Sequence, residues 1–369
     1  MRVHNFNAGP AVLPLEVLEE AKAALVDTNG TGMSILEWSH RSKEYDAVRF
    51  GAEADLRELL GLPAGDSWKV LFLQGGASLQ FAQVPLNFAS RERPGGYVLT
   101  GAWADKALKE AEVLHAGKCL WSGKADGFKR IPKAAEWQVT PELAYAHITT
   151  NNTIYGTQWA ALPDTGAVPL VADMSSDILS APCDARRCSL IYAGAQKNLG
   201  PSGVTVVIIR SDLLERGNKG LNSMLDYGVH AKADGIYNTH PTFAVWLMGR
   251  VLAWIKRSGG VVAMQAANQR KAALLYAEID RTGFWQGHAE VASRSKMNVV
   301  FRARGSALNH ARESALDDAF LSGARERHLV GLEGHRSVGG VRASLYNALP
   351  LASVEALVAW MREFEAARG

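Results

Sequence analysis

Between Lys69 and Ile209, short apolar segments alternate with segments of helical periodicity, and this alternation constrains the fold more than any other feature of the sequence. The apolar segments are rich in β-branched residues and are short enough to form one strand each. Strands separated by helices are typical of βαβ units, in which the strands lie parallel and helices cover the sheet. The sequence therefore predicts an α/β fold with a mostly parallel sheet flanked by helices.

The pattern changes at Ser258-Gly-Gly260, where a long predicted helix stops. Beyond this break we expect a strand over Met297–Arg302 and a final helix over Ser353–Ala367. A chain of 369 residues with 47 % hydrophobic residues can bury the cores of two domains. We therefore expect a large domain over residues 16–258 and a smaller α+β domain over residues 259–369.

Composition argues against several classes of partner. The formal net charge is only +3, and no basic stripe with interleaved aromatic residues indicates a nucleic-acid partner. The first residues lack the apolar core of a signal peptide, and no segment approaches membrane-spanning length. Cys119, Cys183 and Cys188 have neither a disulfide framework nor a zinc spacing. We therefore expect free thiols, no metal site and a cytoplasmic enzyme that acts on small molecules.

A single lysine, Lys197, stands in a turn between two predicted strands. Ser189–Ala193 precedes it, and Gly200-Pro-Ser-Gly203 leads from it into Val204–Ile209. Its neighbours are small, so they offer little apolar surface for its aliphatic stem. Partial desolvation lowers the pKa of such an amine, and the neutral amine condenses with an aldehyde. Taken alone, an ordinary loop lysine is the commoner interpretation, so the assignment depends on groups upstream.

Pyridoxal 5′-phosphate is the aldehyde to consider, because the other groups that it requires have candidates upstream. Besides a lysine, this cofactor needs a phosphate site, a carboxylate for its pyridinium nitrogen and a flat surface to stack on. Gly75-Gly-Ala-Ser78 follows a predicted strand and opens a predicted helix. The free amides at such a helix N-terminus bind anions, and Ser78 adds a hydroxyl.

The carboxylate and the flat surface also come from strand ends. Asp173 ends an apolar segment, at the place where open α/β sheets bind ligands, and Asp177 is a rival one turn later. Trp103 follows a strand and a glycine turn, and its indole provides a planar face. Thr153 follows a fourth strand and is a candidate hydrogen-bond partner for the ring hydroxyl. Each signal is modest alone, but together they predict a pyridoxal 5′-phosphate site.

Seven short motifs occur in a characteristic order: Asn7-Ala-Gly-Pro10, Ser39-His-Arg41, Gly75-Gly-Ala-Ser78, Gly101-Ala-Trp103, Ala193-Gly-Ala-Gln-Lys197, Asn238-Thr-His-Pro-Thr242 and Arg342-Ala-Ser-Leu-Tyr-Asn347. With these motifs the chain resembles the phosphoserine aminotransferases, in the class V group of the fold-type I enzymes that use pyridoxal 5′-phosphate. The resemblance implies a homodimer in which the N-terminal segment 1–15 joins the small domain. It also implies a ping-pong reaction that makes O-phospho-L-serine and 2-oxoglutarate from 3-phosphohydroxypyruvate and L-glutamate, and a second substrate used in vitamin B6 synthesis.

The resemblance also implies a role for individual residues. Those expected to bind the cofactor are Gly76, Ala77, Trp103, Thr153, Asp173, Gln196 and Lys197, with Asn238 and Thr239 reaching the cofactor phosphate of the other subunit. Those expected to bind the substrate are Arg41 and Arg342 for carboxylate, and His40, His335 and Arg336 for phosphate. Lys197 and Asp173 are the expected catalytic residues. Some members carry arginine where this chain has Ala77, so part of the expected positive charge is missing.

Three other functions stay open from the sequence. A related class V transaminase that acts on alanine, serine or glyoxylate would share Lys197 and Asp173 but would not need His335 and Arg336. A cysteine desulfurase would need a cysteine in the small domain, and all three cysteines precede residue 200. A nucleotide-binding module would need a G-x-G-x-x-G turn or a P-loop lysine, and the Gly75-Gly76 turn has neither.

Overall fold

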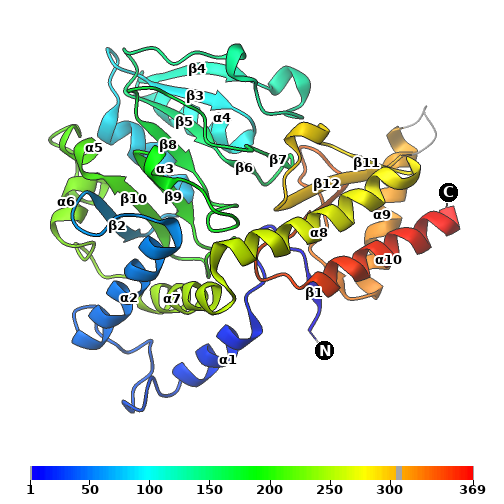
Figure 1. The fold of residues 1–369 in the computed structure, drawn as a ribbon, viewed down its shortest axis with the longest axis horizontal. Helices are drawn as coiled ribbons and strands as arrows, with labels where there is room; N and C mark the ends of the chain where they lie inside the picture. Colours follow the sequence, from blue (N-terminus) through cyan, green and yellow to red (C-terminus); the bar gives the residue numbers. More distant parts are fainter. Residues whose placement is uncertain (1, 305–309, 369) are drawn as a thin grey trace.

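A large mixed sheet forms the centre of the molecule in the computed structural model, which describes residues 2–304 and 310–368 (Figure 1). Within these residues the sheet has seven strands in the order β2-β10-β9-β8-β5-β3-β4. Their bounds are β2 Trp68–Leu73, β3 Gly95–Leu99, β4 Gly117–Ser122, β5 Tyr145–Thr149, β8 Leu170–Asp173, β9 Leu190–Gly194 and β10 Thr205–Arg210. Strand β10 is antiparallel to both of its neighbours, and the other pairs are parallel. The predicted mostly parallel sheet is confirmed.

Two hydrophobic cores lie on opposite faces of this sheet, because successive side chains of a strand point to opposite sides. On β10, Val206 and Ile208 belong to one core, while Val207 and Ile209 belong to the other. The helices that contribute to the first core include α1 Leu15–Ala24, α2 Lys43–Leu60 and α7 Thr242–Arg257. Those of the second core include α3 Gly76–Phe88, α4 Ala102–Val113, α5 Ser211–Glu215 and α6 Tyr227–Lys232. The sheet is therefore covered by helices on both faces, as predicted.

Helix boundaries follow local capping signals. The Ser42 hydroxyl accepts a hydrogen bond from the Tyr45 amide at the start of α2, and Gly61 ends the helix with a φ of 63°. At the predicted break, Gly259 has a φ of 95° between α7 and helix α8 (Gly260–Thr282). The break is confirmed, while the division into two domains at this point stays a prediction.

The C-terminal part has its own sheet and core. Strands β11 (Trp285–Gly287), β12 (Asn298–Ala303) and β14 (Val341–Ser344) form an antiparallel sheet in that order. Helices α8, α9 (His310–Glu326) and α10 (Leu351–Arg368) belong to this part, and α8 packs against α10 (Figure 1).

The N-terminal segment lies in the C-terminal part, as the resemblance implied. Strand β1 (His4–Asn5) pairs in parallel with β13 (Leu329–Val330). Phe6 and Val12 contribute to the C-terminal hydrophobic core.

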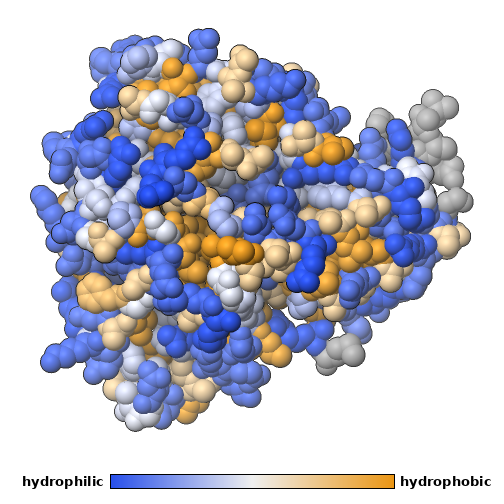
Figure 2. Space-filling view, in the orientation of Figure 1, coloured by the Kyte–Doolittle hydropathy of each residue, from blue (hydrophilic) through white to orange (hydrophobic). Residues whose placement is uncertain are grey.

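Hydrophilic residues cover most of the face seen in Figure 2, and hydrophobic ones gather toward its middle. Among the described residues, no helix combines the length and the apolar character needed to cross a bilayer.

Candidate active site

The carboxyl ends of neighbouring parallel strands bring the predicted cofactor residues to one edge of the sheet. Asp173 is the last residue of β8, and Lys197 follows β9 after two residues of a turn. Trp103 lies in the first turn of α4, directly beyond β3. Thr153 follows the short hairpin strand β6 (Asn151–Asn152), which continues from β5 and pairs with β7 (Thr157–Gln158). The sequence prediction that these side chains meet at a sheet edge is consistent with this topology.

The amine of Lys197 lies close to two of these side chains. Its Nζ donates a hydrogen bond of 2.6 Å to Thr153 Oγ1 and lies 5.5 Å from the ring centroid of Trp103. Burial lowers the pKa of Lys197 to about 8; the Asp173 carboxylate opposes this shift, and the Arg342 guanidinium adds to it. A larger fraction of the amine is therefore neutral, and able to act as a nucleophile, than for an exposed lysine at the same pH.

Asp173 is a buried carboxylate with a built support. One of its oxygens accepts hydrogen bonds from the Ser175 amide at 3.0 Å and from Ser175 Oγ at 2.6 Å. Ser175 Oγ in turn accepts a hydrogen bond of 3.1 Å from the Gly194 amide at the end of β9. Burial raises the pKa of Asp173, while Lys197 and Ser175 oppose the rise. A cationic ring nitrogen beside this carboxylate would favour its ionised form, so the environment suits the pyridinium partner.

Asp177, the rival carboxylate, is engaged elsewhere. It accepts hydrogen bonds from Thr150 Oγ1 at 2.5 Å and from Gln158 Nε2 at 3.2 Å. Burial raises the pKa of Asp177 to about 7. The geometry therefore favours Asp173, at the strand end, over Asp177.

The start of α3 has the form of a phosphate cradle. Gly75 precedes the helix with a φ of 88°, and Gly76 begins it with a φ of 67°. A Cβ built at Gly76 would meet no atom within 4 Å, so the turn is open on that side. The first amides of a helix have no partner within the helix, so they are available to an anion.

One buried donor of the site also lacks a partner. Among the described residues, no hydrogen bond reaches the buried Trp103 Nε1. Together with the open turn at Gly76 and the supported Asp173 carboxylate, this donor makes the residues present a fit for pyridoxal 5′-phosphate.

Three of the predicted substrate residues come from the C-terminal part. Arg342 lies on β14, and burial lowers the pKa of its guanidinium. Its Nε is buried and has no hydrogen-bond partner among the described residues. His335 and Arg336 lie in the loop between β13 and β14. Burial lowers the pKa of His335, and Arg342, Arg336 and Lys106 lower it further. These cations therefore lie near one another, as binding of an anionic substrate requires.

The other predicted residues are not brought to Lys197 within this chain. His40 and Arg41 lie in the turn before α2, and no hydrogen bond or ion pair among the described residues joins either to Lys197. Thr239 and Asn238 contact Gln74, the residue after β2: Gln74 Nε2 donates to the Thr239 carbonyl at 2.8 Å, and Asn238 Nδ2 donates to Gln74 Oε1 at 3.4 Å. Thr239 does not cap helix α7, because Pro241 is the N-cap and no side chain caps that end.

Sequence reasoning missed two neighbours of Lys197. The Tyr346 hydroxyl donates to the Ala8 carbonyl at 2.8 Å, and Thr153 is among its other hydrogen-bonding neighbours. A Cβ on Gly9, whose φ is 137°, would lie 3.1 Å from Lys197 Cγ, so a larger residue there would push against the lysine stem. Gly9 and Tyr346 both belong to motifs that carry the family resemblance, and membership of these motifs was the sequence signal that could have identified them.

Comparisons with known proteins agree with this geometry. The family model for aminotransferase class-V matches residues 3–357. A phosphoserine aminotransferase from Geobacillus kaustophilus (strain HTA426) is 54 % identical over 364 residues, which are 98 % of each chain.

Solved structures are equally similar. A phosphoserine aminotransferase from Bacillus circulans subsp. alkalophilus superposes with a TM-score of 0.95 at 50 % identity, over 100 % of this chain and 99 % of that one. A phosphoserine aminotransferase from Trichomonas vaginalis with bound pyridoxal phosphate gives a TM-score of 0.90 at 37 % identity, over 98 % of this chain and 100 % of that one.

Proposed function

The chain belongs to the phosphoserine aminotransferases of aminotransferase class V, and from this we propose how its own residues perform the reaction. It is an enzyme dependent on pyridoxal 5′-phosphate that transfers the amino group of L-glutamate to 3-phosphohydroxypyruvate in serine biosynthesis. The products are O-phospho-L-serine and 2-oxoglutarate. The predicted fold-type I architecture, enzyme class and cofactor are thereby confirmed. The observation that carries the assignment of the centre is the Lys197 amine, bonded to Thr153 beside Trp103.

We propose that four elements hold the cofactor. The amides of Gly76 and Ala77 at the start of α3 bind its phosphate, and Trp103 stacks on its ring. Asp173 keeps the ring nitrogen protonated, supported by its two bonds from Ser175. Lys197 is the covalent attachment point, and Gln196 precedes it in the same turn. When bound, the cofactor withdraws electrons from the substrate Cα and so makes the Cα proton acidic.

Lys197 then acts as general base and general acid. With the cofactor bound, its Nζ would take the proton from the substrate Cα as a base and release that proton as an acid in the next step, while the cofactor would supply the electron sink. A pKa of about 8 for Lys197 suits this exchange, because a catalytic base works best with a pKa near the operating pH. The hydrogen bond to Thr153 orients Nζ for the transfer. Transfer to the keto acid repeats these proton steps in reverse, which gives ping-pong kinetics.

The two anionic ends of the substrate are proposed to bind different cations. Arg342, with its buried and unpartnered Nε among the described residues, binds the carboxylate, and Arg41 binds nearby. His40, His335 and Arg336 bind the phosphate. Charge-assisted bonds from guanidinium to carboxylate or phosphate supply both affinity and orientation. Because Ala77 supplies no positive charge, binding of the phosphate depends more on His335 and Arg336 in the loop between β13 and β14.

We further propose a homodimer with shared sites in the cytoplasm. Asn238 and Thr239 lie beside Gln74, the residue after β2, which supports a role near a cofactor phosphate, and the resemblance supports assigning that role to the cofactor of the other subunit. The cytoplasmic assignment is supported by Cys119, Cys183 and Cys188, which are all free thiols.

Two measurements test the function. Addition of L-glutamate to the cofactor-loaded enzyme should convert the visible spectrum to that of the pyridoxamine form. The kcat/KM for 3-phosphohydroxypyruvate should then exceed that for hydroxypyruvate. A preference for the unphosphorylated keto acid would instead favour a related class V transaminase.

The second substrate, 3-hydroxy-2-oxo-4-phosphonooxybutanoate, gives 4-phosphohydroxy-L-threonine for vitamin B6 synthesis and stays a prediction. It requires a steady-state comparison of the two phosphorylated keto acids.

A further inference from the structure

Lys271 is a buried lysine on α8 for which the proposed reaction gives no role. Its side chain is only 2 % exposed. Its Nζ donates to three main-chain carbonyls, those of Leu345 at 2.8 Å, Tyr346 at 2.7 Å and Leu349 at 3.1 Å. None of the ion pairs in the described part of the chain includes it, and burial lowers the pKa of its ammonium to about 7. A buried ammonium is costly unless all three donors are satisfied, and here one short segment satisfies them.

That segment, residues 345–349, is hydrogen-bonded to the residue that follows Lys197. The Asn347 amide donates to Asn198 Oδ1 at 3.0 Å, and Asn198 is the residue after Lys197. Asn268, one turn before Lys271 on α8, donates to Asn347 Oδ1 at 2.8 Å. Helix α8 therefore holds the segment at both its carbonyls and its asparagine, and the segment holds the turn that carries the reactive lysine.

A second connection runs through side chains. Tyr346 belongs to the same segment, and its hydroxyl donates to the Ala8 carbonyl at 2.8 Å. Thr153 is another hydrogen-bonding neighbour of that hydroxyl, and Thr153 accepts the 2.6 Å bond from Lys197 Nζ. The segment is thus linked to Lys197 by two routes, through the side chain of the adjacent Asn198 and through Thr153, which binds the amine.

We propose that Lys271 is a positioning residue for the reaction: by binding the carbonyls of residues 345, 346 and 349, it fixes the segment that sets the position of the Lys197 amine. Lys271 does not touch the amine, the substrate or the cofactor. This inference extends the proposed function to a further residue. Its kinetic test depends on the proposed function, whereas its hydrogen-exchange test does not. Small displacements of a reacting group cost large factors in rate, so loss of this support should appear in kcat.

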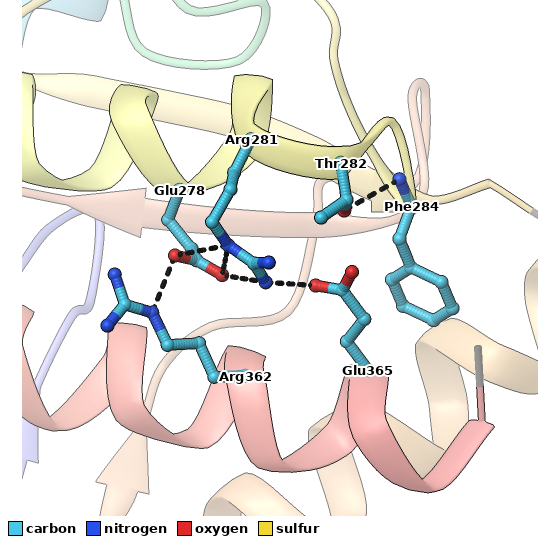
Figure 3. A network of polar contacts seen from close by, with 6 residues as sticks. All are labelled: Glu278, Arg281, Thr282, Phe284, Arg362 and Glu365. Carbon is cyan, nitrogen blue, oxygen red and sulfur yellow. Dashed lines mark hydrogen bonds and ion pairs between the residues drawn. The ribbon is translucent and has the colours of Figure 1, made fainter.

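The same helix offers a matched control in Glu278, two turns beyond Lys271. Glu278 is also a buried charge, 1 % exposed. Its carboxylate accepts hydrogen bonds of 2.8 Å from Arg281 Nη2 and from Arg362 Nε, and Arg281 also pairs with Glu365. Figure 3 shows this network between α8 and α10, with no residue of the Lys197 turn in it. Glu278→Gln therefore perturbs a buried charge on α8 without perturbing the segment 345–349.

The test compares Lys271→Met with Glu278→Gln in the cofactor-loaded protein. Hydrogen exchange followed by mass spectrometry should become about 10-fold faster or more at residues 195–200 and 345–349 in Lys271→Met alone. The kcat should fall by roughly 10- to 100-fold, with KM for either substrate changed less than about 3-fold. The pH midpoint of the visible absorbance of the bound cofactor should shift in Lys271→Met and not in the control. Unchanged exchange at 195–200, or equal changes in both variants, would overturn the proposal.

A second variant covers the case in which Lys271→Met does not fold. Asn268→Leu removes the bond to Asn347 and leaves the ammonium in place, and it should also accelerate exchange at 195–200. Normal exchange there would again contradict the inference. A wild-type protein that fails to transaminate would refute the proposed function, whereas the exchange measurement stands apart from that result.

Discussion

Lys197 Nζ donates a hydrogen bond of 2.6 Å to Thr153 Oγ1, although the two residues come from different strand ends and lie 44 positions apart in sequence. Thr153 in turn is a hydrogen-bonding neighbour of Tyr346. The amine is therefore held in place before any ligand arrives. A preorganised amine loses less entropy on reaction, so we propose that this bond contributes to catalysis as well as to the fold.

Lys197→Ala should give a folded protein without turnover. The start of α3, Trp103 and Asp173 stay in place, so the cofactor can still bind, but the covalent attachment and the proton carrier are both lost. We expect the visible absorbance of the covalently held cofactor to disappear and transamination to fall by at least about 10⁴-fold. Circular dichroism provides the folding control. Near-normal turnover of the variant would refute the assignment of the centre.

The reactivity of the Lys197 amine should have an unusually low pH midpoint in the cofactor-free protein. Its pKa lies at about 8, below the ordinary 10.5, because burial disfavours the ammonium. Acetic anhydride labelling, read by mass spectrometry, should therefore show a midpoint near pH 8 at Lys197. Exposed Lys22 serves as the internal control for reagent delivery. A midpoint near 10.5 at Lys197 would contradict the burial argument.

The same pKa shift predicts how stability depends on pH. Between about pH 8 and 10.5 the unfolded chain keeps the Lys197 proton and the folded chain does not, so the unfolded state binds more protons. The contribution of Lys197 to the free energy of unfolding therefore rises with pH across this window. Below about pH 8 the burial of the ammonium destabilises the folded state to its full extent. The difference in unfolding free energy between wild type and Lys197→Met, measured by urea titration at pH 7.5 and 9.5, should shift in favour of the wild type at the higher pH.

Arg336→Ala should reduce discrimination for the phosphorylated substrate. A charge-assisted hydrogen bond is worth roughly 1.5–3 kcal/mol, so the kcat/KM for 3-phosphohydroxypyruvate should fall by about 10- to 150-fold. Hydroxypyruvate has no phosphate to pair with the guanidinium, so its kcat/KM should change much less. The ratio of the two constants in wild type and variant is the measurement. An unchanged ratio would show that Arg336 is not a phosphate ligand.

Mixed dimers test whether Asn238 and Thr239 complete the site of the other subunit. A dimer of Lys197→Ala with an Asn238→Ala/Thr239→Ala double variant contains one site with both lesions and one with neither. Each parent should be inactive or weak, and activity should return on subunit exchange to about half of wild type per dimer, since one of two sites is intact. An active monomer at working concentration is the outcome that rules this arrangement out.

Much of the fold follows from local signals in the sequence. Helix α2 covers Lys43–Leu60, because its Ser42 cap and the left-handed Gly61 are adjacent in sequence to the helix that they bound. Asp173, Trp103 and Lys197 were found because ligand residues follow strand ends in open α/β sheets. These inferences need only the order of segments along the chain.

What escaped prediction depends on contacts between distant segments. Lys271 looks like any lysine of an amphipathic helix, and its burial arises only because residues 345–349 fold back onto α8. The hydroxyl of Tyr346 likewise donates a hydrogen bond to the Ala8 carbonyl, although the two residues are separated by nearly the whole sequence. The roles of His40, Arg41 and the pair Asn238–Thr239 stay predictions. For Asn238 and Thr239 the predicted partner is the cofactor phosphate of the other subunit, which a single chain does not contain.

The pairing of β1 with β13 has a consequence for the order of events during synthesis. His4 and Asn5 leave the ribosome first, but their partners Leu329 and Val330 leave almost last. The large sheet has all its strands by residue 210, so it can collapse while the first residues still lack a partner. Gly9 lies beside the stem of Lys197, and we expect it to reach this position only after that late pairing. A nascent chain stalled before residue 329 should therefore have a protease-resistant sheet, but the surroundings of Lys197 should be incomplete. The enzyme would then become reactive only in one of the last steps of its folding.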